Sequence, residues 1–301
     1  MNEDFIDYRL ERVGQFAQLA AILEVISFKV GNVNPMYEFH DTKFEDFILG
    51  SIAIAPAIRN STLNGFRAGK GEISLKDIGI GENIRKAVVD IRRSHSGGNT
   101  HLGMVMLMVP IAASAGISFP CNKFILSELR KNIVEIISNS TVNDTLQLYE
   151  AIKISGTKTL GRLKTPRVPF YELMKISSRS DRNAEELSNG MRIILNEGYP
   201  YIEKFYKKTG SFRDAIAMAH LNILSKYPDT FIARKAGMDK AEYVSRRARD
   251  VLDYGGIMSE DGRREMEEFD NELRRDDNLL NPGSTADIVA ASLFVYFLLK
   301  F

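Results

Sequence analysis

A polar turn that runs directly into an apolar stretch constrains this 301-residue chain more than any other feature. Residues 97–103 read Gly-Gly-Asn-Thr-His-Leu-Gly, and residues 104–115 are almost wholly apolar. The two leading glycines free the backbone for a turn, and the apolar run predicts a helix that must be buried, with a kink at Pro110. The stretch therefore predicts a polar tip on a core helix.

The polar tip fits two interpretations. A helix N-terminus presents unpaired N–H groups and partial positive charge, so Asn99, Thr100 and His101 would lie where a phosphate or carboxylate binds well. Alternatively, Asn99 or Thr100 caps the helix by accepting a hydrogen bond from its first free N–H groups. The stretch alone leaves both open.

Similar polar clusters precede three other expected helices. An acid and a hydroxyl stand together in Asp41-Thr42, in Asp229-Thr230 and in the Thr285 to Asp287 segment, which follows a Pro-Gly turn. Arg234 and Lys235 lie about one turn beyond Asp229, and an acid, a hydroxyl and two cations suit a nucleotide, although a surface ion pair explains Asp229 and Arg234 as well. One polar cluster at a helix start can be explained as a cap, whereas four such clusters predict that these helix starts line a shared pocket.

Apolar residues recur mainly at three- and four-residue steps, and no strand-like alternation persists. We therefore predict an all-α, single-domain bundle of about ten to twelve helices over residues 1–301. A long loop is expected at 60–81. A basic break at 155–169 is either a lid over phosphates or a solvated linker. Helices are expected at 8–27, 42–58, 82–94, 104–115, 122–138, 144–154, 171–178, 183–195, 202–208, 211–226, 240–254, 259–275 and 288–299.

Charge and composition exclude several classes of protein. Lysine and arginine total 40 against 39 acidic residues, so no global field gathers nucleic acid or an anionic membrane. The apolar segments 102–117 and 288–301 are shorter than the roughly 20 residues that cross a bilayer, which favours core helices. The single cysteine, Cys121, and the polar Asn2-Glu3-Asp4 start indicate a reducing cytoplasm. A homodimer is left open.

Individual residues raise further expectations. Glu24 lies among apolar residues, where a carboxylate is costly unless something binds it. Thr42 and Glu45 have the spacing of a capping box, so Asp41 and Asp46 would flank a helix start and either hold Mg²⁺ or complement the helix dipole. We expect His95 at the surface and His220 in the core. No P-loop, Rossmann, CxxC or HExxH motif is present.

Five ordered motifs together resemble the triphosphoribosyl-dephospho-CoA synthase family, from about residue 15 to about residue 298. The motifs are Glu24-Val25 with Gly31-Asn32-Val33, His40-Asp41-Thr42 with Phe44 and Asp46-Phe47, Gly98-Asn99-Thr100-His101 with Gly103, Pro228-Asp229-Thr230 with Arg234 and Gly237, and Asn281-Pro282-Gly283 with Thr285-Ala286-Asp287.

The resemblance implies a reaction in which the 2'-hydroxyl of 3'-dephospho-CoA displaces adenine from the ribose C1 of ATP. Such chemistry needs a base for the hydroxyl, a carboxylate near the cationic sugar centre, and Mg²⁺ with cations and helix N-termini for the triphosphate. On this resemblance, Glu24 or Asp287 is the base and His101 assists the leaving adenine. Mg²⁺ is assigned to Asp41, Asp46 and Asp229, and substrate or phosphate binding to Asn32, Asn99, Thr100, Thr230, Arg234, Lys235 and Thr285.

Two positions depart from the pattern of members tied to citrate lyase. Residues 28–31 read Phe-Lys-Val-Gly where those members have Pro-Lys-Pro-Gly, and Leu102 stands where they have lysine. Loss of the cation at position 102 leaves the acceptor open. The alternatives are a different ribosyl or phosphoribosyl transferase or hydrolase in cofactor synthesis, and a module that binds a nucleotide without turnover.

Overall fold

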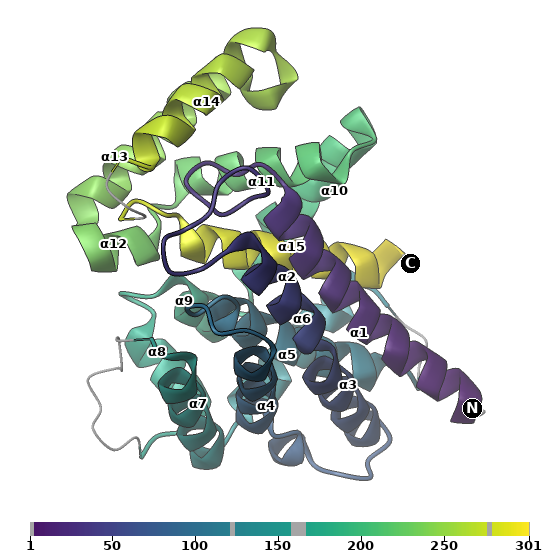
Figure 1. Cartoon of the computed structure of the whole chain (residues 1–301). Coiled ribbons are helices and arrows are strands. Elements are labelled where there is room, and N and C mark those ends of the chain that lie inside the picture. Colours follow the sequence, from purple (N-terminus) through teal and green to yellow (C-terminus); the bar gives the residue numbers. More distant parts are fainter. Residues whose placement is uncertain (1–2, 121–123, 158–166, 276–278, 301) are drawn as a thin grey trace.

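The computed structural model describes residues 3–120, 124–157, 167–275 and 279–300, and these residues form helices and no strand. The all-α prediction is confirmed, with somewhat more helices than expected (Figure 1). Their bounds are α1 Glu3–Ile26, α2 Phe44–Ala53, α3 Ala55–Gly69, α4 Ile80–Ser94, α5 Leu102–Ser118, α6 Leu126–Ser138, α7 Val142–Ser155, α8 Phe170–Ser177, α9 Arg182–Asn189, α10 Tyr199–Thr209, α11 Phe212–Lys226, α12 Thr230–Ala236, α13 Met238–Asp253, α14 Glu260–Leu273 and α15 Gly283–Lys300.

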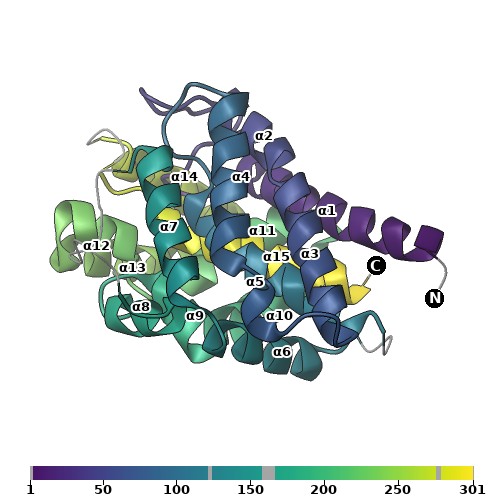
Figure 2. The ribbon, with the colours of Figure 1, turned by 90° about the horizontal axis from the view of Figure 1, so that it is seen from below.

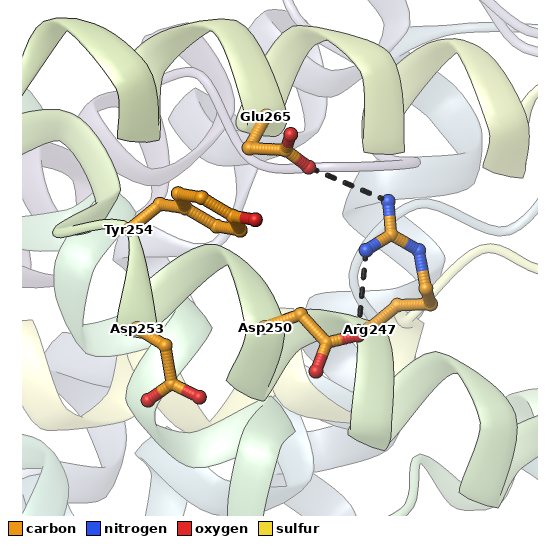
Figure 3. A pocket seen from close by; sticks show the side chains of 5 residues that line it. All are labelled: Arg247, Asp250, Asp253, Tyr254 and Glu265. Carbon is orange, nitrogen blue, oxygen red and sulfur yellow. Dashed lines mark hydrogen bonds and ion pairs between the residues drawn. The ribbon is translucent and has the colours of Figure 1, made fainter.

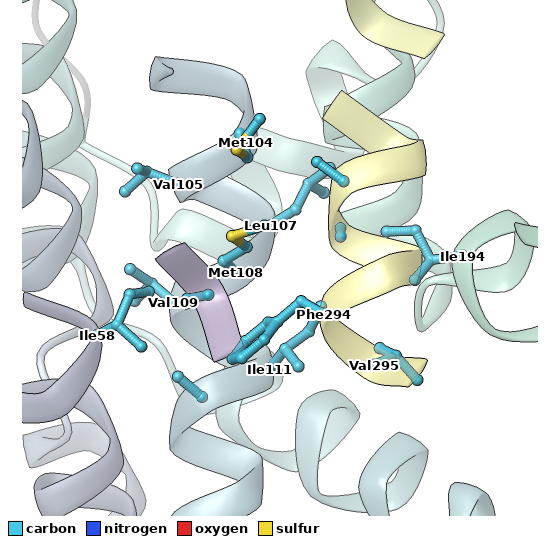
Figure 4. Packing of buried hydrophobic residues seen from close by; sticks show 14 of the residues in the cluster. Ile58, Met104, Val105, Leu107, Met108, Val109, Ile111, Ile194, Phe294 and Val295 are labelled. Carbon is cyan, nitrogen blue, oxygen red and sulfur yellow. The ribbon is translucent and has the colours of Figure 1, made fainter. Parts of the chain in front are cut away.

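Helix α5 lies at the centre of the larger core, as its apolar sequence predicts. Leu107, Met108 and Ile111 have no exposed surface, and Phe294 of α15 points toward them (Figure 4). Helices α7, α4 and α3 lie side by side over α5 and α15 (Figure 2). A second, smaller core joins α11, α13 and α14, and α14 lies at the edge of the molecule in Figure 1.

Helix α15 is long and apolar enough to cross a membrane by length and composition, but 78% of that stretch is buried inside the protein. A core helix passes the same test, and burial of this extent is what a core helix requires. This burial agrees with the interpretation of residues 288–301 as core.

The prediction of a long loop at 60–81 is wrong for its first half, because α3 continues to Gly69. Two glycines in that half were interpreted as loop residues. Gly65 lies against the backbone of Ala113 and Gly69 against that of Ile117, so close that a Cβ on either glycine would overlap the backbone of α5. Glycine lets the two helices approach, which the sequence alone does not reveal. Only the stretch from Lys70 to the start of α4 is mainly irregular, with one short turn at Leu75–Asp77.

The helix expected at 42–58 is divided in two. Helix α2 begins at Phe44, and Asp46, rather than Glu45, completes its cap by accepting a hydrogen bond from Lys43 N at 2.8 Å. Pro56 lies in the first turn of α3, where its missing N–H costs nothing. The capping signal was therefore shifted by one residue.

The helix expected at 183–195 also divides, because α9 ends before Gly190 and a π-helical segment, Ile194–Gly198, follows. Buried Glu186 accepts hydrogen bonds from Ile193 N at 2.9 Å and Ile194 N at 2.8 Å. These bonds satisfy the free N–H groups of the new helical start. The basic break lies largely outside the described residues, and so does Cys121.

Candidate functional site

The starts of α9, α12 and α15 are bonded to one another, although they are far apart in sequence. Arg182 N donates to Thr230 Oγ1 at 2.9 Å, Thr230 N donates to Ser284 Oγ at 3.1 Å, and Thr285 N donates to Asp229 Oδ2 at 2.7 Å. These three N-terminal ends therefore meet at one place in the molecule (Figure 1).

Asp229 is the centre of this junction and its carboxylate is saturated. Oδ1 accepts from Phe231 N at 2.8 Å and Ile232 N at 3.1 Å, and Oδ2 accepts from Thr285 N and Thr285 Oγ1, each at 2.7 Å. A carboxylate has about four lone-pair positions, and four donors fill them. Asp229 therefore does not fit the Mg²⁺ role that the sequence suggested, because it caps α12 and binds α15. The hydroxyl of Thr285 is engaged in the same junction.

Asp287, one turn into α15, is held by Asn183 from α9. Asn183 Nδ2 donates to Asp287 Oδ2 at 2.8 Å, and both side chains press on Gly103 in the first turn of α5, where a Cβ would overlap them. Burial raises the pKa of Asp287 to about 8, the Asn183 amide opposes that rise, and the charges of Glu24, Asp181 and Asp229 add to it. Asp287 is therefore largely protonated at neutral pH.

Glu24, near the end of α1, forms a buried ion pair with Lys29. Lys29 Nζ lies 3.2 Å from Glu24 Oε1, and it also donates to the backbone oxygens of Glu24 and Ser27. Burial raises the pKa of Glu24 while Lys29 opposes that rise, and burial lowers the pKa of Lys29. The partner that Glu24 needed is Lys29, a residue the sequence did not single out as functional.

The loop after α1 is tied to α11 and α14. Asn32 Nδ2 lies 3.3 Å from His220 Nε2, and Gly31 N donates to Asp270 Oδ1 at 2.7 Å. Burial lowers the pKa of His220 to about 3, so His220 is a neutral core histidine, as the sequence predicts. Asn32, assigned to substrate binding from sequence, lies 6% exposed beside it.

A second cluster surrounds the turn before α5. Gly98 N donates to Asp41 O and to Thr42 Oγ1, each at 3.2 Å, and Gly97 packs on the Asp46 carboxylate. Asp41 and Asp46 therefore lie on either side of the turn 97–98, a contact that their predicted place at a helix start did not indicate. Among the described residues no group of three or more His, Cys, Asp or Glu could hold a metal ion. Asp41 is exposed, and one or two carboxylates are what Mg²⁺ on a phosphate needs.

His95 is not a surface residue, contrary to expectation. Its side chain is 1% exposed, with Nε2 3.2 Å from Thr100 Oγ1 and Nδ1 3.6 Å from Asp46 Oδ1. Burial lowers the pKa of His95, and the Asp46 charge opposes this. The residue lies directly after α4 on a bend whose exposure the sequence could not indicate.

His101 has both ring nitrogens engaged by protein hydroxyls. Ser51 Oγ donates to Phe47 O at 2.7 Å, so His101 Nε2–H donates to Ser51 Oγ at 3.0 Å. His101 Nδ1 then accepts from Thr100 Oγ1 at 2.7 Å. Burial lowers the pKa of His101 to about 3, and its side chain is 1% exposed. His101 therefore has no free nitrogen for a leaving group, in contrast to the assignment from sequence, and joins α5 to α2.

The remaining predicted residues fall at or near these two clusters. Asn99 Oδ1 accepts from Leu102 N at 3.3 Å, which is the capping alternative. Arg234 is exposed and pairs with Asp181 at 2.6 Å, and Lys235 lies over the Phe231 ring. The first turn of α5 connects the clusters, because His101 belongs to one and Gly103 contacts the other.

Several buried polar atoms have no hydrogen-bond partner among the described residues. They are Arg182 Nε, Asn183 Oδ1 and Asn281 Oδ1 near the starts of α9 and α15, and also His95 Nδ1, His220 Nδ1 and the Tyr149 hydroxyl. Buried polar groups are nearly always hydrogen-bonded, and exceptions require an explanation. A polar ligand at the junction of α9, α12 and α15 is an explanation that fits the first three atoms.

Two cavities lie elsewhere. One cavity, of about 430 Å³, lies between α13 and α14 and is lined by Arg247, Tyr254 and three acidic residues, Asp250, Asp253 and Glu265 (Figure 3). The other cavity, of about 310 Å³, is lined by Ile26, Phe28 and Ile257 and by residues of α11 and α14. Neither contains any of the predicted site residues.

Sequence reasoning missed Lys29, Ser51, Asn183 and Gly103. Only Gly103 carried a signal, as the glycine closing the central motif, because a glycine in the first turn of a helix lets a side chain from another helix lie against the backbone. The other three are recognisable only from partners far away in sequence.

The fold and the clusters define an all-helical protein with buried acids, amides and a lysine at converging helix ends. The chain belongs to the ATP:dephospho-CoA triphosphoribosyl transferase family, whose model matches residues 10–301. This confirms the resemblance drawn from the five motifs.

Several relatives are similar over different lengths. A Vibrio cholerae protein named "Probable 2-(5''-triphosphoribosyl)-3'-dephosphocoenzyme-A synthase" is 22% identical over 96% of this chain and 88% of its own. A Salmonella typhimurium protein with the same name, numbered 1, is 21% identical over 68% of this chain, and the match spans 63% of that relative's length. A solved Archaeoglobus fulgidus chain, assigned as a triphosphoribosyl-dephospho-CoA synthase, superposes with a TM-score of 0.64 and 24% identity, covering 86% of this chain and 100% of its own. At that identity the likeness shows the fold.

Proposed function

We propose that this protein is a transferase that joins ATP to 3'-dephospho-CoA and releases adenine. The bond from ribose C1 of ATP to adenine N9 breaks, and a bond from that C1 to the 2'-oxygen of dephospho-CoA forms. The hydroxyl loses a proton and adenine gains one. Membership of the family supports this proposal, and the single observation that carries it is the presence of two acids with different partners, buried Glu24 beside the Lys29 ammonium and half-buried Asp287 beside the Asn183 amide.

The two acids suit opposite halves of the proton transfer. Asp287, with a pKa of about 8, holds a proton at neutral pH and would give it to the departing adenine. Glu24 is paired with Lys29, which favours its carboxylate, and would take the proton of the attacking hydroxyl. This extends the prediction from sequence, where either acid could be the base.

The phosphates would bind at the helix starts. Arg234 and Lys235 are exposed near the junction of α9, α12 and α15, and Asn99 and Thr100 precede α5. Thr230 and Thr285 would support these ends rather than donate to phosphate, because their hydroxyls are engaged. Mg²⁺, which would neutralise the triphosphate, fits Asp41 and Asp46. His101 would hold the turn 97–100 in place.

A different acceptor is the second candidate, favoured by one observation. Leu102 replaces the lysine of citrate lyase-associated members and is 7% exposed, so it supplies no cation at the start of α5. A related ribosyl or phosphoribosyl transferase or a hydrolase would then use the same acids.

The test is incubation with ATP, Mg²⁺ and 3'-dephospho-CoA, followed by chromatography of free adenine and mass spectrometry of the product. We expect stoichiometric adenine and coupled product, and a loss of kcat of about 10²- to 10⁴-fold in Asp287→Asn. ATP binding, measured by calorimetry, should persist in that variant. Adenine without coupled product would indicate the hydrolase. Binding of ATP with no turnover on either substrate would indicate a binding module.

A further inference from the structure

Asn183 is fixed on both sides before any ligand binds. Asp181 caps α9 by accepting from Ala184 N at 3.1 Å, which places Asn183 in the first turn. The amide of Asn183 then reaches Asp287 Oδ2 at 2.8 Å, and the backbone of Gly103 prevents both side chains from moving towards α5. Asn183 is also buried, with 6% of the residue exposed.

The direction of this hydrogen bond determines where the proton of Asp287 lies. Nδ2 of an asparagine is a donor only, so Asp287 Oδ2 must be the acceptor. In a protonated carboxyl group the carbonyl oxygen is a better acceptor than the hydroxyl oxygen. The bond from Asn183 to Oδ2 therefore favours the hydrogen on Oδ1, the oxygen that Asn183 does not bind.

The other end of the amide is unoccupied by protein. Asn183 Oδ1 is buried and has no hydrogen-bond partner among the described residues. A buried carbonyl without a hydrogen bond destabilises the protein, and a ligand that brings an N–H or O–H would recover that loss. Asn183 thus uses Nδ2 to bind Asp287 and leaves Oδ1 to accept a hydrogen bond from a donor.

We propose that Asn183 is a positioning residue that places the carboxyl proton of Asp287 on Oδ1, and that its own Oδ1 accepts a hydrogen bond from an amine or hydroxyl of a bound nucleotide. The first half stands on the hydrogen bond from Asn183 to Asp287 together with the raised pKa of that carboxyl. The second half rests on the proposed function, because it needs a nucleotide at this junction.

The charged groups around Asp287 set the background for a test. Glu24 faces it from α1 with Lys29 as its partner, Asp181 from the cap of α9, and Asp229 from the cap of α12, whereas α5 contributes only the glycine backbone. None of these groups is altered by a change at position 183. A shift in the titration of Asp287 is therefore attributable to the lost amide or to its replacement.

The first experiment follows the Asp287 carboxyl carbon by ¹³C NMR as a function of pH, with Asp287→Asn to assign the signal. Loss of the amide donor should raise its pKa by about one unit or more in Asn183→Asp and in Asn183→Leu. The matched control is Asn189→Asp at the exposed end of the same helix, where the Arg192 N–H keeps an acceptor. In the wild-type protein, the chemical shifts of the Asn183 side-chain amide protons should change with pH, with a midpoint at the pKa of Asp287. This measurement tests the hydrogen bond without any variant.

The second experiment separates the two halves kinetically. Asn183→Asp keeps an oxygen acceptor, so we expect KM for ATP to change less than about twofold. In the same variant the fall of kcat at alkaline pH should occur at a higher pH than in the wild type. Asn183→Leu removes the acceptor as well, and KM should rise by roughly tenfold, the equivalent of one hydrogen bond.

Two results would overturn the inference. The positioning role would be excluded if the pKa of Asp287 were the same in Asn183→Asp, Asn183→Leu and the wild type. It would also be excluded if the chemical shifts of the wild-type Asn183 amide protons did not depend on pH. An unchanged KM in Asn183→Leu removes the substrate contact. If the wild-type protein does not react with ATP and dephospho-CoA, the proposed function fails while the NMR titration still decides the positioning role.

Discussion

At the scale of single residues, the buried pair of Glu24 and Lys29 has the largest predicted effect on stability. Lys29→Met leaves the Glu24 carboxylate buried without its partner and should lower the free energy of unfolding by about 3–5 kcal/mol. The double variant Glu24→Gln with Lys29→Met should recover most of that loss, because no charge is then buried alone. Urea denaturation measures both. The exposed pair of Lys153 with Glu150 is the control, and Lys153→Met should change stability by less than about 1 kcal/mol.

Equal stability of the single and double variants would contradict this expectation, because it would mean that Glu24 takes up a proton when Lys29 is lost and leaves no charge buried alone. The sequence indicated half of this pair. A carboxylate among Leu23, Val25 and Ile26 predicts a bound partner, because burial of a lone charge is expensive. The partner itself lies beyond the end of α1, and no helical spacing relates the two residues. The cap at Asn99 was predictable as one of two alternatives, since capping needs only local geometry.

At the scale of helices, the approach of α3 to α5 depends on glycine. Gly65→Ala would place a Cβ inside the backbone of Ala113, and we expect it to lower the free energy of unfolding by about 1–3 kcal/mol or more. Gly14→Ala in α1 is the matched control, because its Cβ would meet Ala55 at an ordinary 3.6 Å. That change should be neutral or stabilise by up to about 1 kcal/mol through helix propensity. Thermal denaturation distinguishes them, and a similar effect of both would argue against the close approach.

The same glycines explain which helices the sequence could predict. Amphipathic helices such as α4 and α11 have boundaries within a few residues of expectation, because their apolar period is a local property. Helix α3 was interpreted as a loop from Asn60 onward, since glycine signals flexibility unless the facing helix is known. The start of α2 was shifted by one residue because Asp46, rather than Glu45, occupies the third position of the helix.

At the scale of the molecule, the candidate site is assembled from segments that the sequence correctly marked as polar helix starts. The structure bonds Asp229 directly to Thr285, and brings Asp229 and Glu24 close enough for their charges to affect Asp287. Asp41 belongs instead to a second cluster before α5. Which starts meet depends on the packing of α5 against α15 and α9, and no local pattern encodes that packing.

Asp287 makes the stability of the whole molecule depend on pH in a defined direction. Its pKa rises from an ordinary 3.8 to about 8 on folding, so the fold favours the protonated form. The stability from this group is fully present below about pH 4 and is lost as the pH rises to about 8. Asp287→Asn cannot titrate, so its melting temperature should exceed that of the wild type by several degrees at pH 9 and by little at pH 5. Calorimetry at pH 5, 7 and 9 measures this difference, in which contributions of other acids largely cancel. A gap that is equal at pH 5 and pH 9 would mean that Asp287 is ionised in the folded protein at both, and Asp287 could then not serve as the acid for a leaving adenine.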